Sequence, residues 1–542
     1  MSRSSFRPMA ALALAMGLVA YVGCNTGTDG TGGDLPAAKP SSAESAKPGA
    51  AGSETGASKK LFADWPKPVA ALLISGEQDG YLEPCGCTSG QLGGLRRRYD
   101  LIRHLRETDQ WPLALVDLGS LVKDPAGARG GPEQVKIKFS VALKALEMLK
   151  YDAFALSAED LKLGVGELLG QIINLAEKPR VVVANVKPAE GFDQNIRPSV
   201  KTKTGPLTIG ITAILDPDAL AKLKDDEKET LLPTILSPEA ALPGVLADLE
   251  KDTDTQVLLV QGPPELAKSL AAKFPGFDIV VATSNSDPDA DPERLNGGKT
   301  LLVQVGTKGK FVGVIGLYND PNQKYRFQRV PLNSRYNSDA GPMRKLIEDD
   351  FQEMLKQAGV VENFPRRNYV GGAPGATFVG AETCKTCHPG TYAKWAASKH
   401  AHAFEDIVKD PKGDRSDHQF DAECISCHTT GFEYNSGWKS AQATAYLKGN
   451  QCENCHGPAS KHAEEPSNLE FRKLIARTAA GADKAGLCYR CHDEDNSPKF
   501  NFQTYWGQIN HKGLDQYTDP KVREGIKPAE IGAGAAASRP AK

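Results

Sequence analysis

The sequence predicts two folded domains, an N-terminal α/β domain and a C-terminal domain that is mainly helical or irregular. With 542 residues, the chain is too long for one compact domain. Short Val- and Ile-rich runs alternate with amphipathic stretches over residues 66–335, whereas Cys, His, Gly and Pro dominate residues 378–515. Residues 336–377 then form the connection, with one further helix at 340–358 and a Gly-, Ala- and Pro-rich stretch.

Residues 1–24 are predicted to be an export signal. Two arginines precede an apolar run of residues 9–22, which is too short to span a bilayer comfortably. Small residues before Cys24 resemble the cleavage box of bacterial lipoproteins, although Tyr21 stands where such boxes usually have Leu. We expect an exported, periplasmic protein that is lipid-anchored through Cys24. A plain secretory signal is the alternative. Because no acidic retention signal follows Cys24, we expect the anchor to lie in the outer membrane.

Both ends of the mature chain have compositions that are typical of unfolded segments. Residues 25–65 are rich in Gly, Ala, Ser, Thr and Pro and predict a flexible linker, and residues 516–542 predict a disordered tail. The net charge of the chain is -2, with 24% charged residues, so no global basic field suggests nucleic acid as a partner.

The α/β prediction depends on alternating strand and helix candidates. The strand candidates span residues 69–74, 113–116, 181–184, 207–214, 256–260, 277–282, 301–305 and 311–317. The helix candidates span residues 95–106, 134–149, 166–177, 238–251 and 264–274. Their alternation favours buried sheets that are covered by helices.

The C-terminal domain carries four Cys-x-x-Cys-His motifs, at residues 384–388, 424–428, 452–456 and 488–492. Two cysteines three residues apart can bond the two vinyl groups of one haem, and the adjacent histidine then ligates the iron. Zinc is the alternative for a Cys-x-x-Cys pair, but here a histidine follows all four pairs. We therefore predict four covalently attached haem c groups. The attachment residues are Cys384, Cys387, Cys424, Cys427, Cys452, Cys455, Cys488 and Cys491, and the axial residues are His388, His428, His456 and His492.

The other cysteines have separate assignments. The chain has 11 cysteines, of which eight belong to the motifs and one is Cys24. The remaining two are Cys85 and Cys87, which flank Gly86. They are interpreted as a redox thiol pair, two soft metal ligands or a small strained disulfide, with a loop staple as the structural alternative. The sequence does not rank these.

Six histidines lie outside the motifs, and five of them belong to the C-terminal domain. They are His104, His400, His402, His418, His462 and His511. Their density near the motifs favours a role for some of them as second axial ligands.

The C-terminal domain resembles a known family. Phe-Val-Gly at 378–380, the first motif, Trp395 and Ser-Lys-His-Ala-His-Ala at 398–403 are similar to the opening of the tetrahaem cytochrome c-554 family. Thr-Thr-Gly-Phe at 429–432 and Cys-Glu-Asn-Cys-His-Gly-Pro at 452–458 extend the match. Members of this family accept electrons from hydroxylamine oxidoreductase. The resemblance covers residues 378–512.

The resemblance implies the second axial ligands. It pairs His462 with His388, His400 with His456, and His511 with His492. His428 would be the sole protein ligand of its haem, which leaves one iron position open to a small ligand. His402 or His418 is the alternative second ligand for that haem.

The N-terminal domain resembles the 5′-nucleotidase-like metallophosphoesterases over residues 66–320, and this implies their α/β sandwich. The matching stretches are 75–80, 93–97 and 116–120. The family holds two metal ions with Asp, His and Asn, but most of these ligands are replaced here. The replacements are Glu77, Gln78, Asp79, Ser120, Ala158, Glu159, Asp160, Gln261 and Ser284. Because carboxylates alone hold a hydrolytic centre poorly, we expect a fold without phosphoesterase activity. A remodelled site is the alternative.

The sequence therefore favours electron transfer between redox partner proteins as the function. One alternative is a redox enzyme that acts on a small nitrogen or oxygen species at the haem of His428. The other is phosphoester hydrolysis by the N-terminal domain, with the haems as an appended module. No catalytic residue is assigned.

Overall fold

The computed structural model describes residues 61–84, 90–175, 177–188, 193–223, 234–284, 286–288, 291–320, 322–336, 341–408 and 417–515. All of these belong to one compact unit, Ala57–Lys542. The predicted signal with Cys24, the Cys85 and Cys87 pair, and the predicted tail lie outside the described residues. Among the described residues, no helix is both long enough and apolar enough to cross a bilayer.

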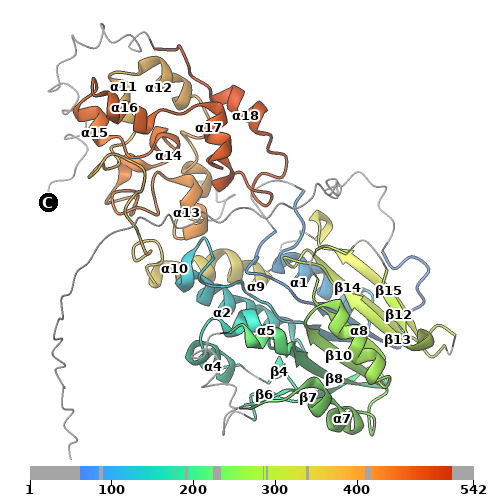
Figure 1. Cartoon of the computed structure of the whole chain (residues 1–542). Coiled ribbons are helices and arrows are strands. Elements are labelled where there is room, and N and C mark those ends of the chain that lie inside the picture. Colours follow the sequence, from blue (N-terminus) through green and yellow to red (C-terminus); the bar gives the residue numbers. More distant parts are fainter. Residues whose placement is uncertain are drawn as a thin grey trace, which may run out of the picture. The chain divides into compact units, whose positions relative to one another are not determined.

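The first sheet of the N-terminal domain has seven strands (Figure 1). Their order is β15 (Tyr325–Pro331), β14 (Phe311–Leu317), β1 (Ala70–Ser75), β2 (Leu113–Asp117), β3 (Ala153–Ala155), β4 (Arg180–Val182) and β6 (Ile196–Arg197). The strands from β1 to β6 pair in parallel, while β14 and β15 add an antiparallel edge.

The second sheet has six strands. Their order is β12 (Glu293–Leu295), β13 (Thr300–Gln304), β11 (Ile279–Ala282), β10 (Thr255–Gln261), β8 (Leu207–Leu215) and β7 (Ser199–Thr204). A separate two-stranded ladder joins β5 (Val186–Lys187) to β9 (Thr234–Ile235). All eight predicted strands are present in the two larger sheets.

The alternation of side chains along β1 shows how the sheets pack. Leu72 and Ile74 belong to a buried cluster that includes Ile209 and Ile211 of β8 in the second sheet. Leu73, between them, belongs to the cluster that contains the helices. Because successive strand residues point to opposite faces, the first sheet is buried on both sides, against the second sheet and against helices.

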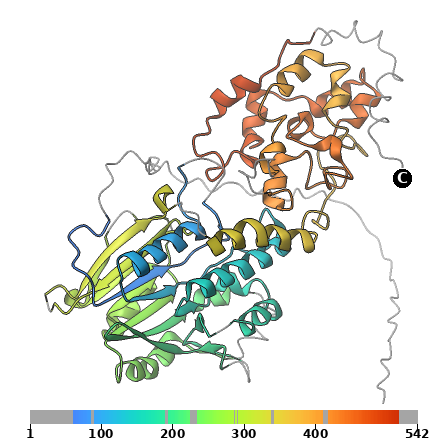
Figure 2. The ribbon, with the colours of Figure 1, turned by 180° about the vertical axis from the view of Figure 1, so that it is seen from behind.

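Helices cover the outer faces of the two sheets (Figures 1 and 2). The helices that follow β1 to β8 are α1 (Leu95–Arg103) with its π-helical continuation η1 (His104–Thr108), α2 (Gly131–Leu149), α3 (Ala158–Leu161), α4 (Val165–Ile173) and α5 (Pro217–Ala221). The second sheet is covered by α7 (Pro238–Leu249) and α8 (Pro264–Lys273). Two residues explain the limits of α2. Pro132 lies in its first turn, where proline is favoured, and Lys150, directly after its last residue, adopts the left-handed conformation that ends a helix. The five predicted helices and the α/β sandwich are thus confirmed.

Two segments that were predicted as linkers belong partly to the core. The helix expected at 340–358 is present as α9 (Gly341–Arg344), π-helical η4 (Lys345–Asp350) and α10 (Phe351–Gln357). It buries Ile347 and Phe351 in the cluster that also holds α2. At the other end, Phe62 and Trp65 of the predicted linker pack against Trp111. Both side chains are half-buried, so these two residues contribute aromatic contacts to the N-terminal domain.

The C-terminal domain consists of short helices and irregular segments. Its α-helices are α11 (Ala381–Lys385), α12 (Pro389–Ala396), α13 (Ala422–His428), α14 (Cys452–His456), α15 (Ser460–Glu464), α16 (Leu469–Ile475), α17 (Ala479–Lys484) and α18 (Phe502–Ile509). Its 3-10 turns are η5 (Glu405–Ile407), η6 (Ala445–Leu447) and η7 (Cys488–Arg490). Fully buried apolar side chains are sparse after Leu447, and all eight motif cysteines are only half-buried. The predicted mainly helical or irregular class is confirmed.

Candidate haem-binding sites

Each Cys-x-x-Cys-His motif lies on a short helical turn. The second and third motifs end α13 and α14, while the histidines of the first and fourth donate their N–H to Cys384 O at 2.8 Å and Cys488 O at 2.9 Å. Residues three and four apart on a helix lie on one face. Both thiols and the imidazole of a motif can therefore reach a single haem.

The Nδ1 atoms of the four motif histidines all have polar partners. His456 Nδ1 lies 2.7 Å from Ile475 O, and His492 Nδ1 lies 2.8 Å from Ser497 Oγ. His428 Nδ1 bonds Ala403 O, and His388 Nδ1 lies 3.7 Å from Asp515 Oδ2. A histidine that uses Nδ1 in this way presents Nε2 to a metal. His428, His456 and His492 are thus prepared to act as axial ligands through Nε2.

Three of these histidines face a second imidazole. The ring centroids lie 6.4 Å apart for His388 and His462, 6.1 Å for His400 and His492, and 5.8 Å for His456 and His511. Metal–imidazole bonds are about 2 Å long, so two imidazoles that share one metal ion have centroids about 6 Å apart. The three pairs therefore fit bis-histidine ligation of iron.

Two of the expected ligand partners are exchanged. The resemblance pairs His400 with His456 and His511 with His492, but the structure brings His400 to His492 and His511 to His456. Only the pair of His388 and His462 has the expected partners. Both pairings are geometrically possible because Cys455 of the third motif lies close to Cys488 of the fourth. A histidine side chain between these two motifs can reach either of them.

His428 has no facing imidazole, and all ten histidines lie in the described part of the chain. The two alternative ligands make other contacts. His402 is exposed with its Nε2 3.1 Å from Ala396 O, and His418 Nδ1 lies 3.3 Å from Gln352 Nε2. The arrangement leaves the position opposite His428 without a histidine.

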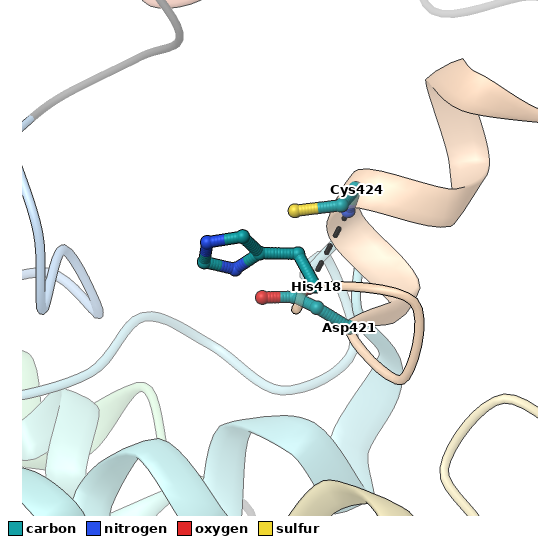
Figure 3. Close-up of side chains that lie close together, drawn as sticks. All are labelled: His418, Asp421 and Cys424. Carbon is teal, nitrogen blue, oxygen red and sulfur yellow. Dashed lines mark hydrogen bonds between the residues drawn. The ribbon is translucent and has the colours of Figure 1, made fainter. Parts of the chain in front are cut away.

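His418 instead lies beside the first cysteine of the second motif (Figure 3). Ligand atoms of His418, Asp421 and Cys424 lie within 4.8 Å of one another, and among the described residues they form the only such group. Asp421 also caps α13 by accepting from Glu423 N at 2.9 Å. Because Cys424 is a predicted haem attachment residue, we interpret the group as the surroundings of that attachment, with no separate ion.

A cavity of about 520 Å³ is lined by His400 and His492, whose rings face one another. Its walls combine Cys455, Cys488 and Cys491 with aromatic side chains that include Phe500 and Tyr505. The volume is in the range of cofactor pockets, and the apolar walls suit a haem. The residues present therefore fit the group that the motifs predict.

Cysteines of different motifs are neighbours. Cys384 interacts with Cys452, Cys427 with Cys491, and Cys455 with Cys488. The second motif also adjoins the third, because Asn454 Nδ2 donates to Thr429 O at 3.0 Å, directly after His428. The four motifs therefore form one group of neighbouring sites.

The edge of the first sheet, where the metallophosphoesterase resemblance places two metals, is occupied by internal hydrogen bonds. Glu77 accepts from Ser284 N through both oxygens, at 2.9 and 2.8 Å. Gln78 accepts from Arg98, and Gln261 donates to Leu118 O. These side chains are held by the protein itself and do not converge on a common point.

The carboxylates at this edge are shifted toward the protonated form. Burial raises the pKa of Glu77 to about 8 and that of Asp79 to about 6. Burial also raises the pKa of Asp160 to about 7, even though Asp160 accepts from Ser120 N at 3.1 Å and Leu121 N at 2.9 Å. Near neutral pH, the carboxyl group of Glu77 is therefore largely protonated, whereas that of Asp79 is largely ionised.

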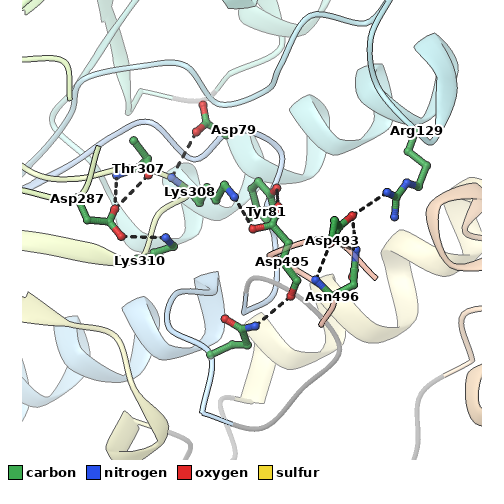
Figure 4. A network of polar contacts seen from close by, with 11 residues as sticks. Asp79, Tyr81, Arg129, Asp287, Thr307, Lys308, Lys310, Asp493, Asp495 and Asn496 are labelled. Carbon is green, nitrogen blue, oxygen red and sulfur yellow. Dashed lines mark hydrogen bonds and ion pairs between the residues drawn. The ribbon is translucent and has the colours of Figure 1, made fainter. Parts of the chain in front are cut away.

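Sequence reasoning missed the residues that join this edge to the fourth motif (Figure 4). Asp495 accepts from Tyr81 Oη at 2.5 Å and is ion-paired with Lys308. Arg129 lies 2.7 Å from Asp493. Single charged residues in loops carry no sequence pattern, so nothing in the sequence indicated this network.

The comparison with family models agrees with the resemblance of the C-terminal domain. Residues 383–457 match the family model for cytochrome c554 and c-prime, and residues 445–497 match the model for a doubled CXXCH motif. Together these matches include all four motifs, so the C-terminal domain is a c-type cytochrome region with covalent haem c. No curated protein matches the chain.

Several solved structures are similar to the chain. The sulfate thiohydrolase SoxB of Thermus thermophilus is 14% identical, with a TM-score of 0.45 over 55% of this chain and 62% of that chain. A 5′-nucleotidase precursor of the same organism is 17% identical, with a TM-score of 0.46 over 60% and 67%. The calcineurin-like phosphoesterase YfkN of Bacillus subtilis is 20% identical, with a TM-score of 0.44 over 54% and 99%. The chain thus spans less than two thirds of the SoxB structure.

Proposed function

We propose that this protein is an exported tetrahaem cytochrome c that transfers electrons between redox partner proteins. The observation that carries the proposal is the gathering of four Cys-x-x-Cys-His motifs in one domain, three of them with a facing imidazole. Haem c supplies a one-electron Fe(III)/Fe(II) couple when it is bound. The chain's own residues attach and ligate the haems through the motif cysteines and the histidine pairs.

The closeness of the motifs supports electron exchange within the domain. Cysteines of the first and third, the third and fourth, and the second and fourth motifs are neighbours, and Asn454 of the third motif donates to Thr429 O beside the second. Such a group of sites holds redox groups close together and suits a carrier that passes electrons between partners.

A second candidate function is reduction of a small nitrogen or oxygen species at the second motif. It is favoured by His428, which has no imidazole opposite it and whose Nδ1 is held by Ala403 O. A haem with an open axial position can bind a small ligand, whereas a bis-histidine haem only passes electrons.

The setting we propose is the periplasm, with a lipid anchor on Cys24 in the outer membrane and residues 25–60 as a tether. The anchor would be checked by fractionating cells that express the protein or its Cys24→Ser variant. The wild type should sediment with outer membranes and the variant should be soluble. A soluble wild type would contradict the anchor and leave the redox function untouched.

Haem counting combined with a redox titration tests the proposed function. Intact mass of the purified protein should correspond to the polypeptide with four haems, and the Cys488→Ser/Cys491→Ser variant should carry one fewer. A spectroelectrochemical titration should then resolve reversible one-electron transitions from all of them. A wild-type mass with fewer haems, or haems that cannot be reduced reversibly, would contradict the proposal.

A further inference from the structure

Arg129 belongs to the N-terminal domain, but its guanidinium lies among the residues that attach two haems. It precedes α2 in a Gly-rich loop. Its Nη1 lies 3.6 Å from Sγ of Cys427 in the second motif, and its Nη2 lies 2.7 Å from Oδ2 of Asp493, which follows His492. It also lines the cavity that His400 and His492 line.

Contacts on two sides hold Arg129 in this position. On α2, Gln134 exchanges hydrogen bonds of 2.8 and 2.9 Å with Asp421 and Ala422 N, and Lys138 lies 2.6 Å from Glu423. These contacts anchor α2 to the start of α13, where the second motif begins.

On the other side, the loop after the fourth motif is bound by the edge of the first sheet. Asp495 accepts from Tyr81 and Lys308, and its carbonyl accepts from Gln91 Nε2 at 2.9 Å (Figure 4). The ion pair of Arg129 and Asp493 lies between these two anchor points, with both side chains about one third exposed at 32%. The guanidinium is therefore fixed and partly shielded from water.

A fixed positive charge at this place has a predictable electrostatic effect. It disfavours the ferric state of a nearby haem, which carries one more positive charge than the ferrous state. It also compensates Asp493, whose carboxylate would otherwise favour the ferric state of the haem at His492. Both effects raise the reduction potential of the nearby haem, and partial burial reduces the screening of these charges by salt.

We propose that Arg129 is a positioning residue for the haem groups attached at Cys427 and Cys491, and that it raises their reduction potentials. The N-terminal domain thereby supplies a positive charge that helps to set the reduction potentials of haems in the C-terminal domain. The inference depends on the proposed electron-transfer function, because it assumes haem at the second and fourth motifs.

The test compares the midpoint potentials of Arg129→Gln, Arg129→Lys and the wild type by spectroelectrochemical titration, with haem content verified by intact mass. In Arg129→Gln, two of the four transitions should move to more negative potential while two stay in place. Arg129→Lys keeps the charge and should remain close to the wild type. Lys136→Gln, which removes a charge paired with Glu133 on α2, should move none.

Asp493→Asn provides an independent check with the opposite sign, since it removes a negative charge from the same pair. It should move two transitions to more positive potential. The inference is overturned if Arg129→Gln leaves all four potentials unchanged, or moves all four equally, in a protein that carries four haems. It is also overturned if Asp493→Asn moves the potentials in the negative direction. A wild-type protein with fewer haems would instead contradict the proposed function.

Discussion

The imidazoles of His456 and His511 face one another, with ring centroids 5.8 Å apart. The α18 helix returns the chain from the fourth motif toward the third, so that a histidine beyond the last motif reaches the third one. The facing rings define an axial pair that sequence order alone does not suggest.

Replacing His511 tests this pair. His511→Ala should convert the haem at His456 from low spin to high spin, because the iron loses one of its two imidazoles. Electron paramagnetic resonance of the ferric protein should show one fewer low-spin signal. The exposed His402 is a matched control, and His402→Ala should leave the spectrum unchanged.

Double variants distinguish the two pairings. If His511 serves His456, the His456→Ala/His511→Ala protein loses a single low-spin haem, since both changes affect the same iron. His492→Ala/His511→Ala should lose two. The reverse pattern would restore the pairing expected from the family resemblance, provided that intact mass shows equal haem content.

The strands of the fold were predictable where burial is strongest. The largely apolar strands β1, β8 and β10 lie within one residue of the predicted limits, because strands that are covered on both faces give nearly continuous apolar runs. The edge strands β7 and β15 were missed, since their half-exposed polar residues give no such run. The three-residue strand β3 is too short for any periodicity.

The candidate site was predictable only in its covalent part. The motif spacing alone identifies the cysteines and the axial histidines, because both lie on one helical turn. The second axial ligands come from segments that are distant in sequence and fold back toward the motifs. The third and fourth motifs are close enough in space for His400 and His511 to exchange their partner motifs. Arg129 was missed because one arginine in a loop resembles any other.

The pKa of Glu77 predicts a pH dependence of stability. Burial raises this pKa from 4.5 to about 8, so the folded protein retains a proton that the unfolded chain releases above pH 4.5. The free energy of unfolding should therefore fall as the pH rises from 4.5 to 8. Since one pKa unit corresponds to about 1.4 kcal/mol, the contribution is on the order of a few kcal/mol.

The Glu77→Gln variant isolates this contribution. It should be more stable than the wild type at pH 8.5, about equally stable at pH 5, and less dependent on pH between them. Urea unfolding followed by far-ultraviolet circular dichroism gives the comparison. Glu353→Gln, an exposed change on α10, should follow the wild-type curve. Parallel curves for Glu77→Gln and the wild type would contradict the assignment.

The buried ion pair of Arg98 and Asp117 should be important for the stability of the first sheet. The two side chains are 1% and 0% exposed, and Arg98 Nη1 lies 3.4 Å from Asp117 Oδ2. Arg98→Met leaves a buried carboxylate without its cation and should cost about 3 kcal/mol of unfolding free energy. Arg98→Met/Asp117→Asn should recover part of this loss. A change of similar size for the exposed control Arg103→Met would contradict the argument.

The edge of the first sheet should not support phosphoester hydrolysis. Glu77, Gln78 and Gln261 are held by internal hydrogen bonds, so added manganese should not bind in stoichiometric amount. Assays with aryl phosphates and nucleotides in the presence of manganese should show no cleavage. Turnover that is lost in Glu77→Gln/Asp160→Asn would show that a remodelled site is active after all.

Low-temperature electron paramagnetic resonance of the fully ferric protein tests the central claim most directly. That claim is a group of four neighbouring haem sites, of which three have paired imidazoles and one, at His428, has an open position. The ferric protein should show low-spin signals that integrate to three haems and a high-spin signal that integrates to one. The high-spin signal should convert to low spin on addition of cyanide. A spectrum with four low-spin haems and no high-spin signal would contradict the account.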